Sequence, residues 1–132
     1  MKYMLDTNIC IYIIKKKPIQ VIQVLQKKKI GDICISTITL AELQYGVEKS
    51  SNKVMNQLAL TEFLAPIEIL NFNDKAARHF GSIRAHLESI GKIIGPFDLQ
   101  IAAHALSEDL ILVTNNTREY ERIPDLKIEN WL

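Results

Sequence analysis

Short apolar runs alternate along this chain with longer segments that carry apolar residues at helical spacing. The short runs contain almost no charged residues, which is typical of strands that are covered on both faces of a sheet. We predict strands at residues 2–5, 33–36, 67–72 and 110–114, with 127–129 as a further candidate.

Between these runs, apolar residues recur every three or four positions, the spacing of an amphipathic helix. The clearest stripe runs from Ala76 to Ile90, with Asn73 or Asp74 placed as its cap and Gly91 as its stop. Helices are expected at residues 7–15, 18–28, 38–48, 53–64, 76–90 and 98–107, the second of them opened by a proline.

Strands that alternate with helices indicate a mostly parallel sheet, because parallel strands need crossover connections. The predicted fold class is therefore α/β, a three-layer α/β/α domain with a short, mostly parallel central sheet. The chain has 132 residues, which suits a single domain spanning residues 1–132.

Composition excludes several classes of protein. An apolar fraction of 48% and a charged fraction of 23% are typical of a soluble globular domain. No run approaches the roughly 20 apolar residues of a membrane span. Cys10 and Cys34 lie in apolar runs without metal-site spacing, which fits a reducing cytoplasm. The net charge of +1 gives no global attraction to nucleic acid, so any such substrate needs local contacts.

Acidic residues stand at several helix starts, where each has a structural explanation. Asp6 directly follows the first strand and suits the cap of the next helix. Glu42 lies three residues after Thr39, the spacing of a capping box. Asp98 falls in a first helical turn, where a carboxylate is favoured by the helix dipole. Taken singly, capping is the better explanation for each acid.

Taken together, the same acids indicate a metal site. Asp6 and Asn116 both follow strands, so they emerge at the same edge of a parallel sheet. Glu42 belongs to the helix after the strand at 33–36, and Asp98 opens the helix before the strand at 110–114. Three converging carboxylates repel one another unless a cation lies between them, and hard oxygen ligands select Mg²⁺ or Mn²⁺ over zinc. Such a site supports attack of water on phosphorus. Gly-rich phosphate loops and the GxSxG elbow are absent, which argues against nucleotide-binding and serine-hydrolase classes.

Four segments resemble, in order and spacing, the motifs of PIN-domain ribonucleases of the VapC toxin group. They are Met-Leu-Asp-Thr-Asn at 4–8, Ile-Ser-Thr-Ile-Thr-Leu-Ala-Glu-Leu-Gln-Tyr-Gly at 35–46, Ile-Gly-Pro-Phe-Asp-Leu-Gln-Ile-Ala-Ala-His-Ala at 94–105 and Leu-Val-Thr-Asn-Asn at 112–116. Segments 81–88 and 128–131 resemble the same group, so the resemblance covers the whole chain.

The resemblance implies a Mg²⁺-dependent endoribonuclease, with Mn²⁺ as a substitute, that forms the toxin half of a type II toxin–antitoxin pair. Asp6 and Asp98 match family positions that contact the metal directly, and Glu42 completes the acidic cluster. The polar residues that would support this cluster are Thr7, Asn8 and Thr114.

The fourth acidic position departs from the family pattern. Many PIN domains carry an acid after the Val-Thr end of the last motif strand, whereas this chain has Asn116. Glu119, one helical turn further on, is the alternative. A neutral amide ligates a metal but offsets no charge, so the sequence leaves open whether one or two ions bind.

Substrate and partners also follow from the resemblance. Members of the group cut structured RNA such as tRNA and are neutralised by a cognate VapB-like antitoxin, which commonly presents an arginine to the acids. Operator DNA would be reached only through the antitoxin. Family members also form homodimers, and the expected location is the cytoplasm.

Several basic residues are candidate RNA contacts. Arg84 and Arg118 each lie beside a family-like motif. The lysine runs at 15–17 and 27–29 either guide RNA phosphates or are solvated helix ends, and the sequence does not separate these explanations.

We expect the aromatic and histidine side chains to have mainly structural roles. Tyr120 and Trp131 could stack on a base, but burial in the core or an interface is the better explanation. The three histidines, His79, His86 and His104, fall in helical segments without metal-binding spacing, so we expect them at the surface or half-buried.

Two other functions remain open from the sequence. The first is a non-toxin PIN nuclease that acts in RNA processing or on DNA flaps. The second is a catalytically inactive module that works only by binding a partner, which Asn116 in place of an acid would permit. A haloacid-dehalogenase-like phosphatase is disfavoured because Asn8 stands where that group has a second acid.

Overall fold

Five parallel strands form the central sheet in the computed structural model, which describes residues 1–132. Their order is β3-β2-β1-β4-β5, and every neighbouring pair is parallel. The strands are β1 (Tyr3–Leu5), β2 (Ile33–Ser36), β3 (Glu68–Leu70), β4 (Ile111–Val113) and β5 (Ile128–Glu129). The predicted mostly parallel sheet is confirmed, and all the carboxyl ends of its strands lie at one edge.

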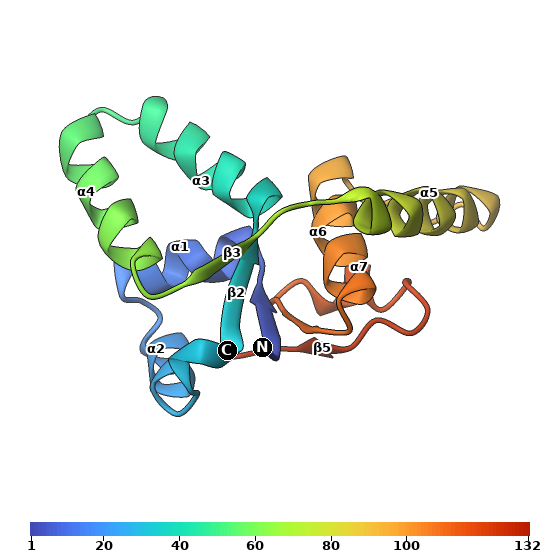
Figure 1. Ribbon diagram of the computed structural model, residues 1–132, viewed down its shortest axis with the longest axis horizontal. Coiled ribbons are helices and arrows are strands. Elements are labelled where there is room, and N and C mark those ends of the chain that lie inside the picture. The colour runs from blue at the N-terminus through green and yellow to red at the C-terminus, as the bar shows by residue number, and fades with distance from the viewer.

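Helices cover both faces of this sheet, as the α/β/α prediction requires. Figure 1 shows α1 to α4 on one side of the sheet and α5 to α7 on the other. The helices are α1 (Thr7–Lys15), α2 (Ile19–Gln26), α3 (Thr37–Glu48), α4 (Lys53–Leu64), α5 (Asp74–Ser89), α6 (Pro96–Ser107) and α7 (Thr117–Tyr120), with a 3₁₀ turn at Ile30–Asp32. No helix is both long enough and apolar enough to cross a membrane.

Alternate residues of the strands enter two separate cores. Met4, Cys34 and Leu112 pack with residues of α5 and α6 on one face. Tyr3 and Leu5 pack with residues of α1 to α4 on the opposite face. Because side chains alternate across a strand, this double burial explains why β1, β2 and β4 are apolar at nearly every position, whereas the edge strands β3 and β5 are more exposed and each carry a glutamate.

The capping and stop residues predicted from the sequence lie at the helix ends, and some helix bounds shift by a few residues. The Asn73 side chain accepts a hydrogen bond from the Ala76 amide at 3.0 Å, and Gly91 has a φ of +68° just beyond α5. Pro96 is the first residue of α6, so this helix begins two positions before the predicted start. Pro18 caps α2 from outside instead of entering its first turn. The short helix α7 was not predicted.

The last residues of the chain return to the first strand. The rings of Trp131 and Tyr3 meet edge to face with centroids 5.9 Å apart, and the two termini lie close together (Figure 1). Trp131 is buried, as predicted. Lys28 donates a hydrogen bond to the Tyr3 hydroxyl at 3.1 Å and pairs with Glu129 at 3.5 Å. This ammonium group therefore links the segment after α2 to the sheet.

Candidate active site

The carboxyl ends of the three middle strands form the platform of the candidate site. Asp6 follows β1, Ser36 ends β2, and Thr114 follows β4, while β2 and β4 flank β1 on either side. All three side chains are buried. Helices α1 and α3 begin here, so their amino ends point to the same edge as the strand ends.

The Asp6 carboxylate caps a helix, and its surroundings disfavour its charged form. It is only 5% exposed, and its Oδ1 accepts a hydrogen bond from the Ile9 amide at 2.9 Å, so the predicted cap of α1 is confirmed. Burial raises the pKa of Asp6 to about 6, and the charges of Asp98 and Glu42 add to the rise. The Thr114 hydroxyl and the Ile9 amide offset it only in part.

Glu42 faces α1 from the second turn of α3. Its half-buried carboxylate accepts a hydrogen bond from the Thr7 hydroxyl at 2.6 Å. The cap of α3 is Ser36, whose Oγ accepts from the Ile38 amide at 3.1 Å. The capping-box explanation for Thr39 and Glu42 is therefore wrong, because the helix begins three residues earlier than that explanation needs.

Asp98 reaches the site from the first turn of α6. Its side chain is half-buried, and burial raises its pKa, with the charges of Glu42 and Glu119 adding to the effect. A carboxylate at a helix amino end is ordinarily stabilised in its charged form. Burial among like charges outweighs that stabilisation here.

Asn116 and Glu119, which compete for the fourth position, bind each other. Asn116 Nδ2 donates to Glu119 Oε2 at 2.8 Å. Asn116 stands at the cap position of α7 but makes no side-chain cap bond. Of the two residues, only Glu119 is charged, and its charge helps to raise the pKa of Asp98.

Tyr120 places a hydroxyl among these acids. Its side chain is 1% exposed, which confirms the expected burial, yet its hydroxyl has no hydrogen-bond partner. Burial raises the pKa of the phenol far above its usual value, and the neighbouring charges of Asp98, Asp6 and Glu119 add to the rise. The sequence indicated that the ring is buried but gave no signal for where the hydroxyl points.

The four acidic side chains lie near one another, but they are not arranged as a set of metal ligands. Asp6, Glu42, Asp98 and Glu119 are linked through the pKa shifts of Asp6 and Asp98. No three His, Cys, Asp or Glu side chains are arranged so that they could hold a metal ion together. Glu42 is turned to Thr7 and Glu119 to Asn116. The candidate metal ligands are all hard oxygen atoms. The raised pKa values of Asp6 and Asp98, beside the buried Tyr120 hydroxyl that lacks a partner, fit a site that takes up a divalent cation.

His104 and Ser36 connect two of the elements that carry the acids. His104 Nδ1 lies 2.8 Å from Ser36 Oγ, and the imidazole meets the Phe72 ring edge to face at 5.6 Å. His104 is completely buried, so the expectation of a surface or half-buried place is wrong for it. It is correct for His79 and His86, which are half-buried and exposed, respectively. Burial lowers the pKa of His104, which keeps the ring neutral at pH 7.

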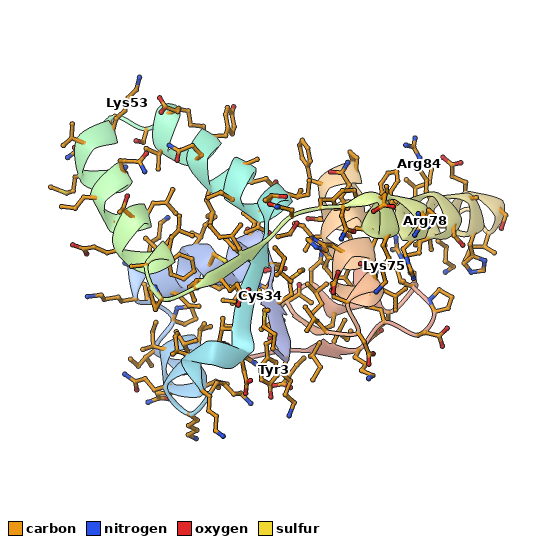
Figure 2. All side chains as sticks on the ribbon, viewed as in Figure 1. Tyr3, Cys34, Lys53, Lys75, Arg78 and Arg84 are labelled. Carbon is orange, nitrogen blue, oxygen red and sulfur yellow. The ribbon has the colours of Figure 1, made fainter.

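The remaining polar candidates lie around this centre at different depths. Asn8 is exposed on α1 and the structure gives its side chain no hydrogen bond. Arg118 is exposed on α7, next to Glu119. Arg84 is exposed and pairs with Glu88 at 3.3 Å, on the upper side of α5 in the view of Figure 2. The lysine run at 27–29 leads into β2, so it lies toward the opposite edge of the sheet from the acids.

Comparison with known families decides which group this arrangement belongs to. The family model described as "PIN domain" matches residues 3–126, which is nearly the whole chain. The chain belongs to the PIN-domain family. PIN domains are nucleases and are in general metal-dependent.

Relatives of this PIN domain match it from end to end. Ribonuclease VapC2 of Haemophilus influenzae is 49% identical over 132 residues, covering 100% of this chain and 99% of that protein. The tRNA(fMet)-specific endonuclease VapC of Shigella flexneri is 48% identical over 131 residues, covering 99% and 98%. These matches place the PIN domain in the VapC group.

Solved structures give the same result for the fold. The VapBC2 structure from Rickettsia felis, bound to a DNA fragment from its promoter, superposes with a TM-score of 0.93 at 48% identity and covers 100% of both chains. The DNA-bound VapBC structure from Salmonella typhimurium gives a TM-score of 0.95 at 45% identity, covering 100% of this chain and 99% of that one.

Proposed function

We propose that this PIN domain is a Mg²⁺-dependent endoribonuclease, the toxin of a VapBC-like toxin–antitoxin pair. One observation carries the proposal: Asp6 is a buried carboxylate with a pKa raised to about 6, held at the end of the central strand within reach of the charges of Asp98 and Glu42. A cap alone does not need such a charge, because Asn caps a helix equally well. A divalent cation at this place would stabilise all three carboxylates.

Asp6 and Asp98 are the residues that would hold the metal directly. Both come from rigid places, a strand end and a first helical turn, so their backbones are fixed before any ligand arrives. Glu42 would complete the set, positioned by the Thr7 hydroxyl. Thr114 supports Asp6 from β4, whereas Asn8 is assigned a weaker supporting role because it is exposed.

The reaction supported by such a site is hydrolysis of a phosphodiester by water. When bound, a divalent cation of this kind lowers the pKa of water and offsets the negative charge that builds up on phosphorus oxygens during in-line attack. The chain's own residues fix the positions of the acids, through the Ile9 amide at Asp6 and the Thr7 hydroxyl at Glu42. Glu119 is our candidate for the fourth acid, with Asn116 holding its carboxylate at 2.8 Å.

The proposed substrate is structured RNA, with tRNA as the first candidate because a relative 48% identical to this chain is named as a tRNA(fMet)-specific endonuclease. Arg118 is the better placed of the two candidate RNA contacts, since Arg84 is paired with Glu88. We further propose one PIN domain over residues 1–132, a cognate VapB-like antitoxin as partner, and homodimers inside a cytoplasmic complex. Operator DNA would be bound only through the antitoxin, by analogy with the VapBC structures that hold promoter DNA.

The two rival functions make different predictions. A non-toxin RNA-processing nuclease would cut RNA but would not arrest growth when expressed alone. An inactive binding module would bind its partner without cutting RNA. The intact acids Asp6, Glu42 and Asp98 favour an active enzyme over the inactive module.

The deciding experiment compares purified wild type with Asp98→Asn on a total tRNA pool in Mg²⁺. Asp98→Asn keeps the size of the side chain and is expected to cut at least about 100-fold more slowly, the scale of losing one group that stabilises transition-state charge. Asp125→Asn is the matched control, because Asp125 is an exposed acid in the loop before β5. Full RNA cleavage by folded Asp98→Asn protein would overturn the assignment.

A further inference from the structure

Tyr120 is a core residue whose polar end emerges at the acidic edge. Its ring belongs to the cluster that contains Met4, Leu99, Ala103 and Leu112, so packing from the sheet and from α6 fixes its orientation. A packed aromatic ring has few rotamers. The position of the hydroxyl is therefore set by the core and not by solvent.

This hydroxyl is unusual because nothing satisfies it. Only two buried side-chain polar atoms in the chain lack a hydrogen-bond partner, and the Tyr120 hydroxyl is one of them. Leaving such a group unpaired costs roughly 1–3 kcal/mol, so unpaired hydroxyls of this kind are rare in cores. A phenylalanine would fill the same space without that cost.

The groups around the hydroxyl determine what it can do. Its charged neighbours are the carboxylates of Asp98, Asp6 and Glu119, with Asp98 the largest influence. Carboxylates only accept hydrogen bonds, so the phenol must be the donor. A charge-assisted bond to one Asp98 oxygen is the natural use of this donor.

We propose that Tyr120 is a positioning residue for Asp98: its hydroxyl donates to one carboxylate oxygen and directs the other toward the metal. This inference rests on the proposed metal-dependent function. Asp98 sits on the first turn of α6, and Tyr120 is the only side chain whose hydrogen-bonding group lowers its pKa. The hydroxyl therefore lies close to this carboxylate, although it makes no geometrically complete hydrogen bond to it. Residues that orient a metal ligand in this way commonly change metal affinity or activity 10–100-fold when removed.

The test is Tyr120→Phe, which removes only the oxygen. Mn²⁺ binding is measured by calorimetry on the full chain at pH 7.5, and RNA cleavage is measured in parallel. The dissociation constant for Mn²⁺ is expected to rise about tenfold, and kcat is expected to fall while the KM for RNA stays unchanged. The metal-free variant should remain folded, because phenylalanine fills the same space in the core.

Tyr3→Phe is the matched control, because Tyr3 is also buried but bonds Lys28 beside α2. It should leave Mn²⁺ binding unchanged. If Tyr120→Phe binds Mn²⁺ as tightly as an active wild type, Tyr120 only fills space and the inference is wrong, while the proposed function stands. If wild type itself takes up no Mn²⁺ and cuts no RNA, the proposed function fails and this inference fails with it.

Discussion

At the scale of single residues, Asp6 shows a conflict between stability and charge. Its carboxylate caps α1, but its burial disfavours the ionised form. An asparagine at this position would keep the bond to the Ile9 amide without the charge. A residue that reduces stability at neutral pH and is nevertheless present is typical of a functional site.

This conflict predicts how stability depends on pH in Asp6→Asn. The raised pKa means that folded Asp6 holds its proton up to about pH 6, whereas the unfolded chain releases it near 3.8. The folded state therefore binds more protons, and wild type loses stability as pH rises from about 4 to 6. Relative to wild type in EDTA, Asp6→Asn should gain about 2 kcal/mol in free energy of unfolding between pH 4 and pH 8. Urea unfolding followed by circular dichroism measures this difference.

Asp74→Asn supplies a control of opposite sign. Asp74 is exposed, and its hydrogen bond and ion pair with Arg78 lower its pKa. Its replacement should therefore lose a little stability as pH rises, where wild type gains from the charged Asp74. If both variants follow the same pH trend, burial of Asp6 is not what controls the difference.

The acids were named from the sequence, and so were Thr7 and Thr114, which contact Glu42 and Asp6. The sequence did not indicate the Ser36–His104 contact or the place of the Tyr120 hydroxyl. Asp6 and Asp98 stand at positions that the chain itself marks, a strand end and a helix start. The Ser36–His104 pair joins residues 68 positions apart, and the Tyr120 hydroxyl meets acids from other elements. Such contacts depend on tertiary packing, which no local pattern encodes.

At the scale of elements, Ser36 at the start of α3 has two structural roles. Ser36 Oγ caps the helix through the Ile38 amide and also contacts His104 Nδ1 on α6. Through this one oxygen, the helix that carries Glu42 is joined to the helix that carries Asp98. The other ring nitrogen of His104 has no partner, so Ser36 makes the only polar contact of that ring.

The double task predicts that Ser36→Ala is more costly than the loss of an ordinary cap. Asn73→Ala removes only the cap of α5 and should cost about 1 kcal/mol of unfolding free energy. Ser36→Ala also leaves His104 buried without a polar partner, and should cost about 1–2 kcal/mol more. Thermal and urea unfolding of the two variants measure the difference. Equal costs would mean that the Ser36–His104 contact contributes nothing to stability.

Regular elements were predictable because their signals are local. The apolar stripe, cap and stop of α5 all lie within its own sequence, and the helix forms from Asp74–Ser89. Strand β3, expected at 67–72, is shorter because it lies at the sheet edge with a neighbour on one side only. Helix α7 has four residues, too few for a periodic pattern to appear.

At the scale of the whole molecule, the fold continues past the end of the family match. The PIN model ends at residue 126, yet β5 completes the sheet and Trp131 enters the core beside Tyr3. Glu129 accepts a hydrogen bond from Trp131 Nε1 at 2.9 Å, which fixes the indole after the last strand. Residues 127–132 are therefore part of the folded unit.

Trp131→Ala tests how much this last segment contributes to the whole. Removing a buried indole is expected to lower the free energy of unfolding by about 3–5 kcal/mol, because the core can close only part of the space that it leaves. Leu132→Ala, at the neighbouring exposed position, should change it by less than about 0.5 kcal/mol. Trp131 is the single tryptophan, so both variants are compared by circular dichroism and not by fluorescence. Since the indole also covers Tyr3 on the central strand, the loss should appear as one cooperative transition at lower urea. A separate early transition would instead mean that the tail unfolds independently of the sheet that carries Asp6.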